Sequence, residues 1–179
     1  RELVDAGLGV AIHSRRAGED ADALVAEIVS GGGRAAVVSA DLTSEADTGG
    51  LIDAAIAAVG PIDCLVNNAS LFERDCLETV TRHSWDRHLD TNLRAPLLLT
   101  QSLARALAET GAAGLVINLI DERVWNLTPD FLSYTISKAG LWALTQTLAL
   151  ALAPRIRVNA IGPGPTLPSP RQTEEQFAR

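Results

Sequence analysis

The sequence predicts an α/β fold in which helices cover both faces of a doubly wound, parallel sheet. Short apolar runs rich in Val, Ile and Leu alternate along the 179 residues with longer segments that have helical periodicity. Gly and Pro stand between the runs and the segments, where the chain is expected to turn. Strands that alternate with helices of about ten or more residues are typical of βαβ units, which form parallel sheets.

The elements follow in a regular order along the chain. The expected strands are apolar throughout, because strands of a parallel sheet are buried on both faces, and they lie at 10–13, 35–39, 64–67, 115–119 and 157–161. The expected helices lie at 19–30, 45–59, 85–109 and 133–152, and residues 1–7 have the pattern of the last turns of another helix. The helices break at 31–33, Gly60, Gly111 and Pro154, and a looser region covers 72–82.

The composition is that of an ordinary globular protein and predicts one domain over residues 1–179. Of the residues, 47% are hydrophobic and 21% are charged. No apolar run is long enough to cross a membrane and the first residues do not form a signal peptide, so we expect a cytoplasmic protein without a membrane partner. The net charge of -7 and the pI near 4.9 argue against a nucleic-acid partner.

The cysteines and histidines predict neither a disulfide nor a metal site. Cys64 and Cys76 are too few for a disulfide framework, and Cys64 lies in an apolar run, where we expect a small buried residue. His83 and His88 are five residues apart in an expected helix and so leave different faces, which predicts surface residues and no metal pair. The sequence contains no Met and ends in a polar stretch at 170–179, so we expect it to be part of a longer protein.

The single tyrosine and the single lysine form the most informative pair. Tyr134 and Lys138 are separated by one helical turn, so both side chains leave the same face of a helix. All other basic residues apart from His are Arg, which cannot replace a compact ammonium. An ammonium beside a phenol favours the phenolate and makes Tyr134 a usable general acid. The alternative is an exposed lysine and a half-buried tyrosine on an amphipathic helix.

Polar, small residues follow the ends of the expected strands, where ligands of doubly wound sheets bind. Five motifs stand out: Asp41-Leu42-Thr43 and Asn67-Asn68-Ala69 at strand ends, Tyr134-x-x-x-Lys138 on the expected helix 133–152, Arg157-Val158-Asn159 in the last expected strand, and Pro163-Gly164 after it. In this order and spacing they resemble the short-chain dehydrogenases/reductases, and the match spans almost the whole chain.

The resemblance implies a Rossmann-type sheet and a nicotinamide-dependent oxidoreductase. It implies that Tyr134 is the proton donor or acceptor, that Lys138 lowers its pKa and binds the nicotinamide ribose, and that Asn92 orders a water leading to the lysine. It also implies a first strand with a glycine-rich pyrophosphate turn before Arg1, a substrate loop after Pro163 to Leu167, and a C-terminal strand, all of which we expect outside this chain.

Asp121 stands thirteen residues before Tyr134, where the family usually has serine. With Phe72 shortly after Asn67 to Ser70, this aspartate resembles the pteridine reductases and the related dihydropteridine or dihydrofolate reductases. The resemblance implies that Phe72 stacks on the pterin ring and that Asp121 and Tyr134 together supply the proton. Phe72 could instead anchor a loop, and Asp121 could cap a helix or pair with Arg123. Trp125 is expected at the rim of the substrate pocket.

The end of the first expected strand predicts the cofactor. An acidic residue there would accept the ribose hydroxyls of NAD, but the chain has His13, Ser14, Arg15 and Arg16. The arginine pair suits a 2'-phosphate and predicts NADP(H), the alternative being a solvated basic turn. Asp41 resembles the residue that accepts from the adenine amino group, or it could be a partner of the next helix N-terminus. Further cofactor contacts are expected from Leu42, Asn68, Ala69, Ser70, Pro163 and Gly164.

The sequence thus predicts an NADPH-dependent reductase that passes hydride to a C=N bond of a pterin-like small molecule. A carbonyl or 3-oxoacyl reductase of the same family, in which Asp121 is a tolerated variant, remains an alternative, as does a dinucleotide-binding sensor without turnover. The helices that begin near Trp85 and Ser133 resemble those through which the family forms dimers and tetramers, so a homo-oligomer is expected.

Overall fold

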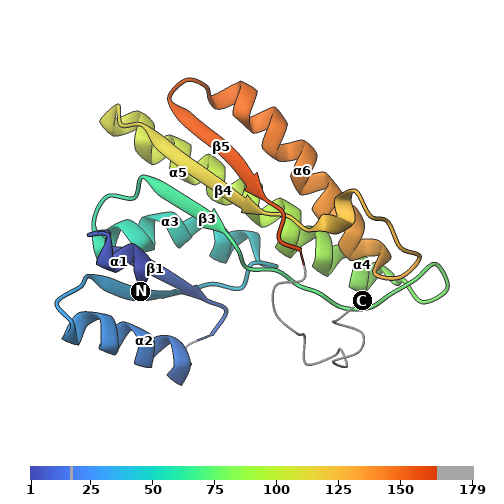
Figure 1. The fold of residues 1–179 in the computed structure, drawn as a ribbon, viewed down its shortest axis with the longest axis horizontal. Coiled ribbons are helices and arrows are strands. Elements are labelled where there is room, and N and C mark those ends of the chain that lie inside the picture. The colour runs from blue at the N-terminus through green and yellow to red at the C-terminus, as the bar shows by residue number, and fades with distance from the viewer. Residues whose placement is uncertain (17, 165–179) are drawn as a thin grey trace.

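Five parallel strands form two sheets in the computed structural model, which describes residues 1–16 and 18–164 (Figure 1). In the smaller sheet β1 (Val10–Ser14) pairs with β2 (Ala35–Ser39). In the larger sheet β4 (Gly114–Leu119) lies between β3 (Cys64–Asn67) and β5 (Ile156–Ile161). The parallel strands, each reached through a helix, confirm the predicted α/β class.

The helices lie close to the predicted positions. Among the described residues they are α1 (Glu2–Asp5), α2 (Glu19–Ser30), α3 (Glu45–Val59), α4 (Arg82–Leu89), α5 (Ala95–Thr110) and α6 (Leu132–Leu152), with a 3-10 turn at Glu122–Val124. The bounds of α2 and α3 agree with the prediction. Ser44 begins α3 because its side chain accepts from the amide of Asp47, and Gly111 ends α5 in the left-handed conformation at φ 71°.

The predicted helix at 85–109 is one continuous but irregular helix. It begins three residues earlier, at Arg82, because Thr81 and Ser84 form a reciprocal capping box. Between α4 and α5, residues Asp90–Arg94 form a π-helical turn, in which the amide of Ala95 reaches the carbonyl of Asp90. Such turns are frequent at functional sites, and this one carries the buried Asn92.

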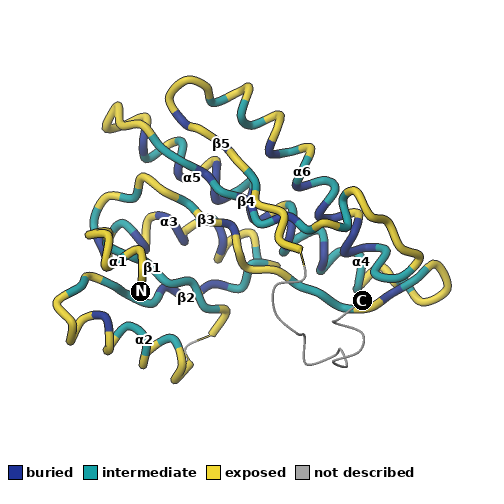
Figure 2. The backbone as a smooth tube through the Cα atoms, viewed as in Figure 1, coloured by how far each residue is buried: buried dark blue, intermediate teal, exposed yellow. Residues whose placement is uncertain are grey.

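Two apolar clusters hold the helices against the strands. The first joins β2 to α3 through Val38, Leu51 and Ile52, and the second joins α5 to β4 and β5 through residues such as Leu103 and Val116. Leu148 and Leu152 bring α6 onto the second cluster, and Leu65 of β3 packs against both. Figure 2 shows buried stretches of these helices in dark blue where they meet the strands.

Two details differ from the sequence-based expectation. The predicted continuous sheet is divided, because no ladder joins β1 to β3 within the part of the chain that the structure describes. Cys64 is exposed rather than buried, and so is Val66, because these two alternate with Leu65, whose side of the strand meets the core. Residues 165–167, after which the substrate loop is expected, and the polar stretch at 170–179 lie outside the described residues.

Candidate active site

The first turn of α6 carries the predicted pair. Tyr134 and Lys138 are both buried, with 5% and 3% of their surfaces exposed. The Lys138 ammonium lies 5.8 Å from the centre of the tyrosine ring and donates to the carbonyl of Leu119, at 2.7 Å. The structure therefore brings both residues to the carboxyl end of β4, and the exposed-lysine alternative is wrong.

Asp121 lies at the end of β4 and joins this pair. The Tyr134 hydroxyl donates to Asp121 Oδ2 at 2.7 Å, while Asp121 Oδ1 accepts from the amide of Arg123 at 2.9 Å. The carboxylate thus caps the 3-10 turn at Glu122–Val124, which was one of the alternatives, and also holds the phenol. Oδ1 thus holds the backbone of the turn, and Oδ2 holds the Tyr134 hydroxyl.

The geometry shifts the two ionisable side chains in opposite directions. Burial, followed by the hydrogen bond and the negative charge of Asp121, raises the pKa of Tyr134 well above its ordinary value, although Arg123 opposes the shift. Burial lowers the pKa of Lys138 from 10.5 to about 8, although Asp121 opposes that shift. Burial and Asp121 together therefore keep the phenol protonated in this structure. The expected lowering of the Tyr134 pKa by Lys138 is not seen here.

An aromatic column stands beside the tyrosine. The Phe72 ring meets the Tyr134 ring edge-on, at 4.6 Å between centres, and stacks on Phe131 at 4.5 Å with 9° between planes. The Arg123 guanidinium lies 4.8 Å above the Phe131 ring, a cation–π contact. Phe72 therefore lies beside the expected proton donor, and Phe131 and Arg123 continue the column of stacked side chains. Stacking of Phe72 on a pterin ring stays a prediction.

Asn92 anchors the segment that leads to Phe72. From the π-helical turn its Oδ1 accepts from the amide of Leu71 at 2.8 Å, and its Nδ2 donates to the carbonyl of Leu71 at 2.9 Å. The same Nδ2 lies 3.0 Å from Ser137 Oγ, which donates to the carbonyl of Tyr134. Asn92 thus joins the segment after β3 to the helix of Tyr134.

The carboxyl ends of β1 and β2 carry the expected cofactor residues. His13 Nε2 lies 2.9 Å from the carbonyl of Ala40, joining the two strand ends. Asp41 accepts from the amide and the hydroxyl of Thr43, and these bonds hold the pKa of Asp41 below its ordinary value. The charges of Arg15 and Arg16 act in the same direction, though more weakly than these hydrogen bonds.

The remaining expected cofactor residues are spread over three neighbouring segments. Leu42 packs against the first apolar cluster and lines a hollow of about 220 Å³ that also includes Asp90 and Arg94. Asn68, Ala69 and Ser70 are exposed after β3, and Ser70 Oγ lies 3.2 Å from Asn92 Oδ1. Pro163 and Gly164 are exposed in the segment after β5.

Trp125 lies at a different place from the aromatic column. Its ring meets the ring of Trp142 edge-on at 5.7 Å, and it lies close to Gly162 at the end of β5. The side chain is 61% exposed. Its place at the rim of a substrate pocket stays a prediction.

Sequence reasoning missed a buried polar group next to Tyr134. His88, predicted to be a surface residue, is fully buried, with its ring 6.2 Å from the tyrosine ring. It can be buried because both ring nitrogens have hydrogen-bond partners, on Glu73, Ser84 and Ser133. Asp75, which is also buried, bonds Ser133 in turn. The only sequence signal for this group is an excess of polar side chains around a short helix.

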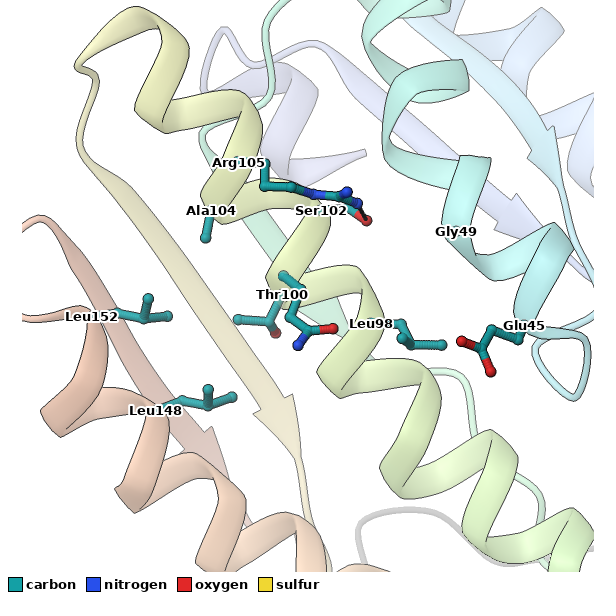
Figure 3. A pocket seen from close by; sticks show the side chains of 10 residues that line it. Glu45, Gly49, Leu98, Thr100, Ser102, Ala104, Arg105, Leu148 and Leu152 are labelled. Atoms are coloured by element: carbon teal, nitrogen blue, oxygen red, sulfur yellow. Dashed lines mark hydrogen bonds between the residues drawn. The ribbon is translucent and has the colours of Figure 1, made fainter.

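A larger hollow lies away from these residues, along the outer side of α5 (Figure 3). Its volume is about 630 Å³, and it is lined by α3, α5 and α6 through Glu45, Gly49, Leu98, Thr100, Gln101, Ser102, Ala104, Arg105, Leu148 and Leu152. It contains none of the expected catalytic residues. Size alone therefore does not identify the site, which the hydrogen bonds around Tyr134 locate at the strand ends.

Two kinds of feature are absent from the residues that the structure describes. Within 1–16 and 18–164, no three His, Cys, Asp or Glu side chains are grouped so that they could hold a metal ion. None of the helices in this part of the chain is both long and apolar enough to span a membrane.

Comparison with known proteins gives a family match over nearly the whole chain. The family model described as short chain dehydrogenase matches residues 1–178. An uncharacterized oxidoreductase of Methylorubrum extorquens is 35% identical over 165 residues, which are 92% of this chain and 65% of that protein. Dehydrogenase/reductase SDR family member 4 of Homo sapiens is 34% identical over 167 residues, 92% of this chain and 59% of that protein. The chain spans less than two thirds of either relative.

Solved structures are similar over the same range. FolM alternative dihydrofolate reductase 1 from Brucella canis, complexed with NADP, is 50% identical with a TM-score of 0.92, covering 98% of this chain and 69% of that one. A short chain dehydrogenase from Burkholderia cenocepacia, also in complex with NADP, is 34% identical with a TM-score of 0.84, covering 91% and 66%.

Proposed function

Because this chain belongs to the short-chain dehydrogenase family, we propose that its protein is an NADPH-dependent reductase and that the substrate is a pterin-like ring. The observation that carries the proposal is the hydrogen bond of 2.7 Å from the Tyr134 hydroxyl to Asp121. A carboxylate at this place would repel the alkoxide that forms when a ketone is reduced. It suits a substrate that offers N–H donors and takes up a proton.

The residues at the ends of β1 and β2 fit NADPH. Arg15 and Arg16 are exposed at the end of β1, and their charges both act to lower the pKa of Asp41. Two neighbouring guanidinium groups can bind a 2'-phosphate by charge-assisted hydrogen bonds. Lys138 and the segment Asn68 to Ser70 would hold the nicotinamide end. The bound cofactor supplies the hydride, which is chemistry that no side chain here can supply.

Tyr134 and Asp121 would supply the proton that accompanies the hydride. Reduction of a C=N bond adds a hydride to carbon and a proton to nitrogen, and Tyr134 remains protonated because its pKa is raised. As the proton leaves the phenol, the Lys138 ammonium, 5.8 Å from the ring centre, would stabilise the phenolate. Asp121 orients the Tyr134 hydroxyl and would accept hydrogen bonds from the N–H groups of the pterin-like substrate.

The wall formed by Phe72 and Phe131 supports a flat, aromatic substrate. Offset or edge-on aromatic contacts are favourable by about 0.5–1.5 kcal/mol beyond area burial. The FolM structure from Brucella canis, named a dihydrofolate reductase, is 50% identical to this chain, which supports a substrate of the same ring class.

The test is oxidation of NADPH by the full-length protein with dihydrobiopterin, dihydrofolate and small ketones assayed in parallel. We expect turnover of a pterin or folate. Tyr134→Phe should lower kcat by about 100-fold or more, since a positioned general acid contributes this much, while NADPH still binds. Asp121→Ser should lower kcat/KM for the pterin. Turnover of ketones alone would refute the substrate and leave the broader reductase, and full activity of Tyr134→Phe would refute the catalytic role.

Cofactor choice has its own test. Replacing both Arg15 and Arg16 by Ala should raise the Kd for NADPH by about ten-fold or more, because two charge-assisted bonds to the 2'-phosphate are lost. The Kd for NADH, which lacks that phosphate, should change little and serves as the control. An equal change for both cofactors would show that these arginines do not read the phosphate.

We also propose that the protein forms a homo-oligomer through α5 and α6. The hollow of Figure 3 is lined by the half-buried Leu98 of α5 and Leu148 and Leu152 of α6, and Leu150 of α6 is 84% exposed. Exposed apolar side chains on adjacent helices favour association with another copy. Light scattering should give a dimer or tetramer, and Leu150→Glu should reduce the mass. A monomer at micromolar concentration would contradict this interface.

A further inference from the structure

His88 connects the segment of Phe72 to the helix of Tyr134. It lies on α4, is fully buried, and belongs to neither the cofactor residues nor the proton-donating pair. The ring stands edge-on to Tyr134, at 71° and 6.2 Å between centres. Its Nε2 lies 3.1 Å from the backbone nitrogen of Glu73, the residue directly after Phe72.

The hydrogen bonds of His88 define one neutral tautomer. The amide of Glu73 can only donate, so Nε2 accepts and carries no proton. Nδ1 therefore carries the proton and donates to Ser133 Oγ at 2.7 Å and to the carbonyl of Ser84 at 3.0 Å. The Ser133 hydroxyl is left to donate to the carboxylate of Asp75.

These bonds form a closed ring that begins and ends in one segment. The direction runs from the amide of Glu73 to His88, then to Ser133, and then to Asp75, two residues after Glu73. All three side chains of the ring are buried, with Asp75 4% exposed and Ser133 and His88 fully covered. Each acceptor in this closed set of hydrogen bonds faces a donor, so each of its polar atoms has a partner.

Asp75 also begins the helix of Tyr134. The residue that precedes α6, Phe131, has a left-handed backbone and provides no side-chain cap. Asp75 supplies the cap from a distant segment, because its Oδ1 accepts from the amide of Ser133 at 3.1 Å and its carbonyl accepts from the amide of Phe131 at 2.7 Å. Tyr134 follows directly, so its place depends on the same ring.

We propose that His88 is a positioning residue for the reaction, holding the segment of Phe72 at a fixed distance from Tyr134 through the acceptor Nε2. This rests on the proposed function, because the distance matters only if a pterin-like substrate binds beside Phe72 and takes its proton from Tyr134. His88 then acts on substrate binding more than on the proton transfer itself.

Two amide variants separate the acceptor from the rest of the side chain. In His88→Gln the amide oxygen reaches the place of Nε2 and keeps the bond to Glu73, whereas in His88→Asn the amide matches only Nδ1 and the acceptor is lost. We expect His88→Asn to raise KM for the ring substrate about ten-fold, with kcat and the Kd for NADPH changed less than about two-fold. His88→Gln should keep a KM close to that of the unaltered protein. His83→Asn, on the exposed side of α4, is the matched control.

A second measurement does not depend on turnover. Hydrogen exchange of the Glu73 amide in the full-length protein should be about ten-fold faster in His88→Asn and unchanged in His88→Gln, because only the former leaves this donor unpaired. If the unaltered protein reduces no pterin, the proposed function fails, and exchange alone then decides whether His88 holds the segment. Equal exchange and equal KM in the two variants would overturn the proposal.

A variant at another corner of the ring covers the case in which His88→Asn does not fold. Ser133→Ala removes the acceptor of Nδ1 and the hydroxyl donor to Asp75, but keeps the backbone bonds of α6. We expect a raised KM for the ring substrate with kcat nearly unchanged. An unchanged KM would show that these hydrogen bonds serve only stability. A fall in kcat alone would overturn a role in substrate binding.

Discussion

Lys138 is the residue whose environment conflicts most with its charge. The residue is 3% exposed, and its ammonium donates to the carbonyl of Leu119. Burial lowers the pKa of Lys138 to about 8. The unfolded chain holds the proton up to about pH 10.5, its ordinary value. Folding is therefore opposed fully below pH 8, and this opposition fades as the pH rises from 8 to 10.5.

Replacement of this lysine should stabilise the protein and abolish its activity. We expect Lys138→Met to raise the free energy of unfolding at pH 7 by on the order of 1–3 kcal/mol, because the buried charge is gone while the carbonyl of Leu119 loses its donor. The gain should shrink as the pH approaches 10. Urea unfolding of both proteins at pH 7 and pH 10 measures it. An equal difference at the two pH values would show that the pKa of Lys138 is not lowered.

The site could be predicted where its members are close in sequence or follow a strand. Tyr134 and Lys138 share a helical turn, and Asp121 directly follows an apolar run, so their positions were readable. The ring around His88 was not, because 58 residues separate Asp75 from Ser133 and 45 separate His88 from Ser133. A polar side chain in a sequence indicates the surface unless its partners are known, and these partners come together only in the folded chain.

At the scale of elements, α5 and β4 approach each other closely where a short turn joins them. A Cβ at Gly114, the first residue of β4, would overlap Cδ1 of Leu107, which is 4% exposed within the second apolar cluster. By contrast, a Cβ at Gly50 in α3 would meet nothing within 4 Å. One position therefore requires glycine for packing, and the other does not.

The two glycines should respond to alanine with opposite signs. Gly114→Ala should lower the free energy of unfolding by about 1–3 kcal/mol, since an overpacked core must shift. Gly50→Ala should raise it by about 0.5–1 kcal/mol, since alanine favours a helix interior and has room here. Denaturant midpoints at constant slope measure both. Stabilisation by both substitutions would mean that Leu107 can move aside without loss.

Element boundaries were predictable because local chemistry sets them. Ser44, Gly60 and Gly111 mark helix ends by capping or by a backbone that glycine adopts easily, and the structure places helix ends beside them. The π-helical turn at Asp90–Arg94 was not predictable, since it differs from an α-helix in one hydrogen-bond step rather than in its apolar pattern. The division between β1 and β3 depends on pairing between distant strands, which no local pattern encodes.

Over the whole molecule, burial is uneven. Every residue of β1 is only partly buried, and α2 buries a single residue, Ile28. In the larger sheet β4 has partners on both edges and contains Val116, which is fully covered. The stability of the chain is therefore concentrated around β4, whereas the expected cofactor arginines stand on the less buried part.

Hydrogen exchange should reveal this gradient. Without added cofactor, amides of β4 should exchange most slowly, at the level of global unfolding, while those of β1 and α2 exchange faster through partial opening. Adding NADPH should slow exchange at β1, because a ligand that binds only the folded form stabilises it. Equal protection in β1 and β4 without cofactor would contradict the gradient.

The burial of Lys138 gives the molecule a built-in chemical label. It is the only lysine among these 179 residues, so an acylated lysine in this part of the protein is Lys138. Its low pKa leaves a useful fraction unprotonated and nucleophilic at mildly alkaline pH, while its 3% exposure keeps reagents out. Acylation at this position can proceed only while the structure around Lys138 opens. The mass increment of the peptide that contains Lys138, followed over time, therefore records how often this part of the protein opens.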